Sequence, residues 1–259
     1  MVPKNKTKAK LDAGGVAFGV TVGVDEIANI ELAGLLGFDY AIIDCEHDLF
    51  NERELENAIR AAEINDLTPI ARMQNNSELI LHALDGGAQG VLIARVNTKE
   101  DATAVIDAAK FRPEGARTIF FRSRGGGFGL NLGSPKQWTL DINRETMIGF
   151  IIEEITAVNN LDEILATKSL DFIDLGPLDL AHSMDWPPQE EVDGFVNKIV
   201  DGSISAGKIA NSGGSAENLS VLLDRGFRMV TVNPRSFYES GAVHFLAHAE
   251  ELMKTKGLS

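Results

Sequence analysis

Short apolar runs alternate along the chain with longer segments of helical periodicity. Eight of the apolar runs are rich in β-branched residues and contain few polar positions, which is typical of strands covered on both faces. We expect strands at 16–21, 40–45, 69–73, 90–94, 148–153, 171–175, 208–211 and 228–232. The segments between them predict helices at 25–36, 52–64, 76–86, 98–110, 157–166, 188–205, 215–225 and 236–254.

Several of these helices begin with a residue whose side chain can accept a hydrogen bond from a free backbone N–H of the first turn. The expected N-terminal caps are Asn51, Asn76, Thr98, Ser215 and Ser236. These signals support the predicted boundaries independently of the hydrophobic pattern.

Eight strands, each followed by a helix, predict a (β/α)₈ TIM barrel that spans residues 1–259 as a single domain. An open doubly wound sheet is the alternative. We favour the barrel because no glycine-rich phosphate loop follows the first strand, and because polar residues recur where the strands end. The segment between 110 and 148 is long for a connection and carries Arg122 and Arg124 before a glycine run. We expect it to form a lid that meets an anionic substrate group, or a contact with a neighbouring subunit.

Composition excludes several classes of function. The 259 residues include 24 Lys and Arg against 38 Asp and Glu, a net charge of −14 that repels nucleic acid. The single cysteine, Cys45, rules out an intramolecular disulfide and a cysteine-rich zinc site. No apolar run has the length of a membrane span, and the N-terminus lacks the apolar core of a signal peptide. We therefore expect a cytoplasmic protein without a membrane partner.

Polar side chains gather where the predicted strands end, and in a barrel these ends meet at one mouth. Glu153 ends the fifth strand, and Asp179 follows the sixth. Two carboxylates at close range cannot both stay ionised without a counter-charge. A divalent cation supplies it, and an all-oxygen pair with open positions suits Mg²⁺ or Mn²⁺. The alternative is a loop cap and a surface carboxylate.

Three further residues at the same mouth can carry acid–base and anion-binding chemistry. His47 follows Asp44 by three residues, and a carboxylate there can fix the imidazole tautomer and leave one ring nitrogen to carry a proton. The guanidinium of Arg72 suits a substrate carboxylate or a developing enolate oxygen. A solvated histidine and a rim salt bridge are the corresponding structural alternatives. His182 is a further candidate, whereas we interpret Cys45 as a packing residue.

These motifs resemble those of a known family. Residues 37–47, GFDYAIIDCEH, are similar to the GFDWLLIDGEH signature of the HpcH/HpaI aldolases, and residues 176–180, GPLDL, are similar to the GPxDLS motif. The resemblance also includes residues 70–72, 84–90, 111–117 (similar to YPPxGxRG) and 152–153, and it spans roughly residues 10 to 245 in order.

The resemblance implies a class II, metal-dependent pyruvate aldolase, an aldehyde-lyase of the phosphoenolpyruvate/pyruvate barrel superfamily. Glu153 and Asp179 would bind Mg²⁺ or Mn²⁺, for which Co²⁺ or Zn²⁺ could substitute. His47 with Asp44 would form the acid–base dyad, and Arg72 would bind the pyruvyl group.

Three other positions are implied to lie near the substrate. Gly176 and Leu178 would lie beside pyruvate, and Asp85 matches an acid near the site or the subunit boundary. The resemblance also implies a homo-hexamer, a trimer of dimers in which neighbours exchange the last helix.

The implied substrate is a small 4-hydroxy-2-oxo acid, such as a 2-keto-3-deoxy sugar acid or a 4-hydroxy-2-oxo-diacid, cleaved reversibly to pyruvate and an aldehyde through an enolate. Cys45, Arg95 and Ala181 depart from the family pattern and leave the aldehyde open. Oxaloacetate decarboxylation, a citrate-lyase-β-like cleavage and a non-catalytic keto-acid-binding barrel remain alternatives.

Overall fold

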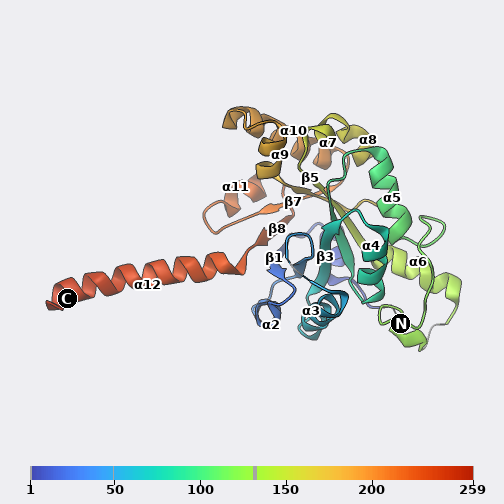
Figure 1. Ribbon diagram of the computed structural model, residues 1–259, viewed down its shortest axis with the longest axis horizontal. Coiled ribbons are helices and arrows are strands. Elements are labelled where there is room, and N and C mark those ends of the chain that lie inside the picture. Colours follow the sequence, from blue (N-terminus) through green and yellow to red (C-terminus); the bar gives the residue numbers. More distant parts are fainter. Residues whose placement is uncertain (1, 49, 131–132, 259) are drawn as a thin grey trace.

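The computed structural model describes residues 2–48, 50–130 and 133–258, and its centre is a closed barrel of eight parallel strands (Figure 1). Each strand pairs with the next in the chain, and β8 pairs back with β1. The strands are β1 Ala17–Gly23, β2 Tyr40–Asp44, β3 Thr68–Gln74, β4 Gly90–Ala94, β5 Met147–Ile152, β6 Phe172–Leu175, β7 Ile209–Gly213 and β8 Met229–Val232. The predicted barrel is confirmed, and no strand boundary differs from its prediction by more than two residues.

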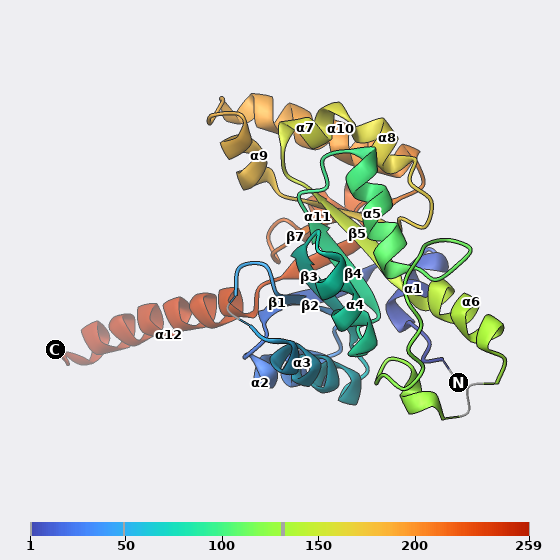
Figure 2. The same ribbon diagram turned by 45° about the vertical axis from the view of Figure 1, so that its right-hand side comes forward.

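Helices surround the strands on all sides in Figures 1 and 2. They are α1 Lys6–Asp12, α2 Ile27–Leu35, α3 Glu52–Ile64, α4 Ser77–Asp85, α5 Lys99–Ala109, α6 Pro135–Glu145, α7 Ile155–Asn159, α8 Leu161–Leu165, α9 Pro177–Ser183, α10 Gln189–Ser205, α11 Leu219–Asp224 and α12 Pro234–Lys256. All eight predicted helices are present, although the predicted 157–166 helix is split into α7 and α8. The helices α1, α6 and α9 were not predicted, because each is short or lies in a segment without a sustained apolar stripe.

Three of the five predicted caps are confirmed. The side chains of Asn51, Asn76 and Thr98 each accept a backbone N–H of the following first turn. The predictions for Ser215 and Ser236 were wrong, since Asn218 and Asn233 occupy the N-terminal cap positions of α11 and α12. In both cases a nearby asparagine defines the helix start.

The amino end of the barrel is closed by α1. Leu11 inserts into the apolar cluster of the barrel interior, and the hydroxyl of Thr7 donates to the backbone oxygen of Asp39 at 2.9 Å. Lys8 forms a 2.7 Å ion pair with Asp171, next to the start of β6. This leaves the carboxyl end of the barrel as the open face.

Large rings fill the barrel interior where two strands carry glycine. A Cβ atom on Gly19 would lie 2.2 Å from the ring of Tyr40, and one on Gly149 would lie 2.2 Å from the ring of Phe172. Both rings are fully buried. The interior is therefore packed, and substrate chemistry is confined to the layer above it.

The last helix, α12, extends away from the barrel in both ribbon views (Figures 1 and 2). Its apolar side chains are exposed, among them Tyr238 at 79% and Phe245 at 70%. No described helix is both long and apolar enough to cross a membrane.

Candidate active site

A cavity opens at the carboxyl end of the barrel and brings together residues that are far apart in the sequence. It contains three of the predicted site residues, His47, Glu153 and Asp179, and also His182. The full lining is Glu46, His47, Gln74, Arg95, Glu153, Glu154, Asp179, His182 and Ser183.

Glu153 is the most enclosed acid of this cavity. It follows the last residue of β5, is only 8% exposed, and its Oε1 accepts the backbone N–H of Arg95 at 2.8 Å. Burial, together with the negative charges of Glu46 and Asp179, raises the pKa of Glu153 to about 7, although the hydrogen bond from Arg95 acts in the opposite direction. The Glu153 carboxyl group therefore lies where a positive counter-charge would stabilise its ionised form.

Asp179 is brought to the cavity by a close approach of two backbone segments. It lies in the first turn of α9, which follows β6 through Gly176. A Cβ atom on Gly176 would lie 2.6 Å from the Cβ of Glu153, so only glycine allows the two segments to meet this closely. Leu178 is 69% exposed on the same turn.

Glu153 and Asp179 fit a hard divalent cation. In the described part of the chain, no group of three or more His, Cys, Asp and Glu side chains is arranged to hold a metal. A zinc site usually needs three or four such ligands, whereas Mg²⁺ keeps several waters and needs one or two carboxylates. The donor set, two carboxylates from adjacent strand ends, thus suits Mg²⁺ or Mn²⁺.

The expected side-chain pair of Asp44 and His47 is not formed in this structure. Oδ1 of Asp44 accepts the backbone N–H of Glu46 at 2.9 Å and that of His47 at 3.2 Å. The imidazole, 67% exposed, lies with its Nε2 3.7 Å from Oε2 of Glu46. Because Oδ1 of Asp44 accepts these two backbone N–H groups, Asp44 stabilises the turn that carries His47. The role of His47 as proton carrier stays a prediction.

Arg72 lies deeper in the mouth, between two carboxylates. Its Nε is 3.1 Å from Oε2 of Glu46 and 3.4 Å from Oδ1 of Asp44. Only 7% of the Glu46 side chain is exposed, so this ion pair is well shielded from solvent. Sequence reasoning missed Glu46 as a site residue, although it lies between Asp44 and His47 in the quoted motif.

A row of hydrogen-bonded side chains crosses the barrel interior just below the mouth. The amide nitrogen of Asn211 donates to Oδ1 of Asp174 at 3.0 Å. The amide oxygen of Asn211 accepts from the hydroxyls of Tyr40 at 3.1 Å and Thr231 at 3.0 Å. Burial raises the pKa of Asp174 to about 7. None of these contacts has a local sequence signal, since each joins a different strand.

Asp85 does not reach the mouth of its own barrel. It ends α4, whose chain continues into the start of β4, and therefore lies towards the amino end of the barrel. Its Oδ1 accepts from Arg117 at 2.6 Å, and the guanidinium of Arg117 lies 4.6 Å from the ring centre of Phe111. A role of Asp85 in substrate binding thus stays a prediction. From this position Asp85 would have to act at the mouth of a neighbouring copy and not at that of its own barrel.

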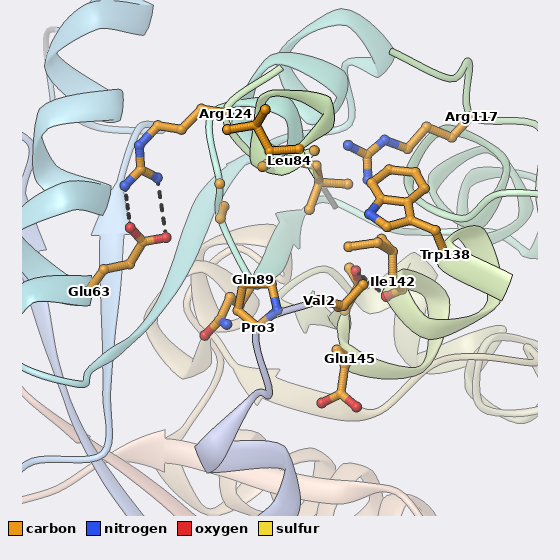
Figure 3. Close-up of a pocket in the computed structure, with 17 residues that line it drawn as sticks. Val2, Pro3, Glu63, Leu84, Gln89, Arg117, Arg124, Trp138, Ile142 and Glu145 are labelled. Carbon is orange, nitrogen blue, oxygen red and sulfur yellow. Dashed lines mark hydrogen bonds and ion pairs between the residues drawn. The ribbon is translucent and has the colours of Figure 1, made fainter. Parts of the chain in front are cut away.

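The segment with Arg122 and Arg124 does not cover the mouth either. Arg124 forms an ion pair with Glu63 of α3 and donates to the backbone oxygen of Gly86 at 3.0 Å. Figure 3 shows this pair beside a second cavity, where Arg117 lies next to Trp138. The expected lid is instead packed against α3 and α4, because both acceptors lie on that side of the barrel.

Comparison with known proteins gives a consistent result. The sequence model of the family described as HpcH/HpaI aldolase/citrate lyase matches residues 19–214. A hydroxypyruvate/pyruvate aldolase of Roseobacter denitrificans is 31% identical over 241 residues, which cover 89% of this chain and 91% of the relative. A 2-keto-3-deoxy-L-rhamnonate aldolase of Escherichia coli K12 is 29% identical over 216 residues, covering 80% and 78%.

Solved structures share the same barrel. An HpcH/HpaI aldolase/citrate lyase family protein from Burkholderia cenocepacia superposes with a TM-score of 0.86 at 21% identity, covering 96% of this chain and 100% of the other. At this identity the similarity establishes the fold, and the chemistry has to be argued from the side chains at the mouth.

Proposed function

The chain belongs to the HpcH/HpaI aldolase/citrate lyase family, and we propose that it is an aldehyde-lyase. The reaction is the reversible cleavage of a 4-hydroxy-2-oxo acid to a short 2-oxo acid, pyruvate in the simplest case, and an aldehyde. The names of the Roseobacter and Escherichia coli relatives support this substrate class. The observation that carries the proposal is one mouth that holds Glu153, Asp179 and His47, with Arg72 beneath.

Glu153 and Asp179 would hold the divalent cation, Mg²⁺ or Mn²⁺. When bound, such an ion supplies Lewis-acid polarisation of a keto oxygen. The chain prepares this position in two ways: the backbone N–H of Arg95 orients the Glu153 carboxylate, and Gly176 lets the turn with Asp179 approach it. The Gly176 and Leu178 backbone would line the same side of the substrate.

Arg72 would bind and stabilise the negative charge of the 2-oxo acid. Its planar guanidinium can contact a carboxylate and an enolate oxygen, and it stays charged throughout the reaction. Glu46 and Asp44 contact its Nε, so the terminal nitrogens of the guanidinium would be the ones that bind the substrate. A prepositioned donor of this kind stabilises charge that develops in the transition state more than charge already present in the substrate.

His47 would move the proton. Its accessible imidazole takes the proton from the C4 hydroxyl, the C3–C4 bond breaks, and the bonding electrons pass into the enolate that Arg72 stabilises. The C4 carbon leaves as an aldehyde, and protonation of C3 completes the 2-oxo acid. Glu46, 3.7 Å from the imidazole Nε2, can stabilise the imidazolium that forms.

We also propose that the protein acts as a homo-oligomer, a hexamer in which neighbours exchange α12, with residues 1–259 of each copy forming one barrel domain. A helix that exposes Tyr238 and Phe245 and leaves its own barrel requires an apolar partner surface. Asp85 of one copy could then approach the mouth of another.

The first experiment follows pyruvate in D₂O by proton NMR, with Mg²⁺ in one sample and excess EDTA in another. Metal-dependent loss of the methyl signal is expected, because enolate formation exchanges the C3 protons. An aldehyde screen then identifies the second substrate. Absence of exchange with Mg²⁺, Mn²⁺ and Co²⁺, together with no cleavage of a 4-hydroxy-2-oxo acid, would contradict the proposed function.

A further inference from the structure

The proposed cleavage contains two proton transfers at different atoms of the substrate. His47 takes the proton of the C4 hydroxyl, whereas C3 needs a proton donor when the enolate becomes the 2-oxo acid. His182 is the second imidazole of the mouth cavity, which it lines together with His47, Glu153 and Asp179. It has no task in the mechanism described so far.

His182 lies on the same wall of the mouth as the proposed cation ligands. It follows Asp179 by three residues in α9, a spacing that puts two side chains on one helix face with their Cβ atoms roughly 5–6 Å apart. The hydroxyl oxygen of Ser183, the next residue, accepts the backbone N–H of Ile155 at 3.1 Å. This hydrogen bond joins the end of α9 to the segment that follows Glu153, so His182 is held beside the position of the 2-oxo acid.

Trp186 packs against the imidazole of His182 and limits its orientation. The ring centres are 5.6 Å apart and the rings are tilted by 58°, which is within the range of favourable aromatic pairs. The chain reaches this arrangement through two consecutive left-handed residues, Asp185 with a φ of 59° and Trp186 with a φ of 58°. Left-handed backbone is strained in residues other than glycine, so the turn that returns the indole to His182 is kept at the expense of folding stability.

His47 and His182 approach the mouth from opposite walls. His47 follows β2 and His182 follows β6, and in a closed barrel of eight strands these two strands lie four positions apart, directly across the mouth. A substrate with its 2-oxo acid end at Asp179 and its C4 hydroxyl at His47 therefore spans the mouth. C3 is bonded directly to the keto carbon, so it stays near the wall that carries Asp179 and His182.

We propose that His182 is a second catalytic residue, the group that protonates C3 of the enolate. This inference rests on the proposed function. The N–H bond of the imidazolium breaks, the electron pair of the enolate C2–C3 double bond forms the new C3–H bond, and the C2 oxygen becomes a ketone oxygen again. His182 is exposed and regains its proton from solvent. In the reverse direction, neutral His182 removes a C3 proton from pyruvate.

Proton exchange at C3 measures this step without the aldehyde. Proton NMR follows the methyl signal of pyruvate in D₂O with Mg²⁺ for the wild type, His182→Gln and the control His82→Gln, an exposed position on α4. General acid–base groups contribute about 100-fold or more to proton transfer, so His182→Gln should lower the exchange rate by about this factor. His82→Gln should exchange at the wild-type rate. Because His182 is exposed, its replacement leaves the barrel core intact.

Mn²⁺ binding, measured by electron paramagnetic resonance, separates proton transfer from a role of His182 at the cation position. The inference requires wild-type Mn²⁺ affinity in His182→Gln. Loss of Mn²⁺ binding in His182→Gln, or exchange at the wild-type rate in this variant, overturns the inference.

Cleavage of a 4-hydroxy-2-oxo acid distinguishes this result from the proposed function. A wild type that cleaves and exchanges, together with undiminished exchange in His182→Gln, would reject only the role of His182. Exchange that is lost in His182→Gln, in a protein that cleaves no 4-hydroxy-2-oxo acid, would support His182 and reject only the aldolase reaction. A wild type that shows neither exchange nor cleavage would contradict both.

Discussion

The backbone N–H of Arg95 donates to Oε1 of Glu153 at 2.8 Å, and Arg95 holds a left-handed φ of 57° at this point. Its side chain reaches the next acid, with Nε 3.0 Å from Oε1 of Glu154. Left-handed backbone costs a non-glycine residue about 1 kcal/mol or more. The contact that orients Glu153 is thus kept at the expense of folding stability.

Replacement of Arg95 tests this strain. We expect Arg95→Gly to be more stable than Arg95→Ala by about 1 kcal/mol, because glycine adopts positive φ without a Cβ clash. Both variants lose the ion pair with Glu154, so their difference reports the backbone alone. Urea denaturation measures it, and equal stabilities would show that the left-handed conformation carries no strain.

Glu153→Gln is expected to abolish metal binding and turnover while the fold is retained. A neutral amide replaces a carboxyl group that burial already disfavours in its charged form, and the shape of the side chain is kept. Mn²⁺ binding by electron paramagnetic resonance is the readout, with the adjacent Glu154→Gln as control. Wild-type Mn²⁺ affinity in Glu153→Gln would refute the ligand assignment.

The Glu46–Arg72 pair is expected to couple in a double-mutant cycle. Arg72→Gln leaves the buried Glu46 carboxylate without its cation. The loss of unfolding free energy caused by Arg72→Gln should therefore be larger in the wild-type background than in the Glu46→Gln background. We expect a coupling free energy of about 1–3 kcal/mol and, for Arg72→Gln, a loss of kcat of about 100-fold or more. If the changes in the free energy of unfolding are additive, Glu46 and Arg72 do not form an ion pair shielded from solvent.

The pKa of Asp174 predicts a pH dependence of stability. In the folded protein this pKa is raised to about 7, against about 3.9 in an unfolded chain, so the native state binds the proton more tightly. The stabilisation of the folded state by protonated Asp174 is complete below about pH 4 and is lost as the pH rises through about 7. Asp174→Asn lacks this loss, so its stability relative to wild type should increase by roughly 1–3 kcal/mol between pH 5 and 8. Denaturation in EDTA measures it, and a pH-independent difference would contradict the shift.

Polar substitutions on α12 are expected to dissociate the proposed oligomer. Tyr238 and Phe245 are exposed on a helix that makes little contact with its own barrel, so glutamate at either position should weaken a subunit interface without unfolding the barrel. Light scattering coupled to size-exclusion chromatography gives the mass. A wild-type mass in Tyr238→Glu together with Phe245→Glu would exclude this face from the interface.

Most of the barrel could be predicted from the sequence, because strands covered on both faces are nearly uninterrupted apolar runs. The strand Gly90–Ala94 was predicted without error, and the capping pattern at Asn51 marked the start of α3 correctly. The segment of α6 carried too weak an apolar stripe to be recognised. Glu153 and Asp179 were proposed because Glu153 directly follows a strand and Asp179 lies in the connection after the next one, where a barrel has its mouth. Both line the cavity at the mouth, and their role as metal ligands stays a prediction.

What the chain determines by itself is therefore local: the periodicity, the strand ends and the type of chemistry available there. Only the tertiary structure decided that Asn211 donates a hydrogen bond to Asp174, that Arg72 pairs with Glu46, and that Asp85 lies away from the mouth. These relations depend on the register between strands and on the direction in which each side chain leaves a closed barrel. Neither quantity is encoded in the spacing of residues along one strand, because each is set by the packing of all eight strands together.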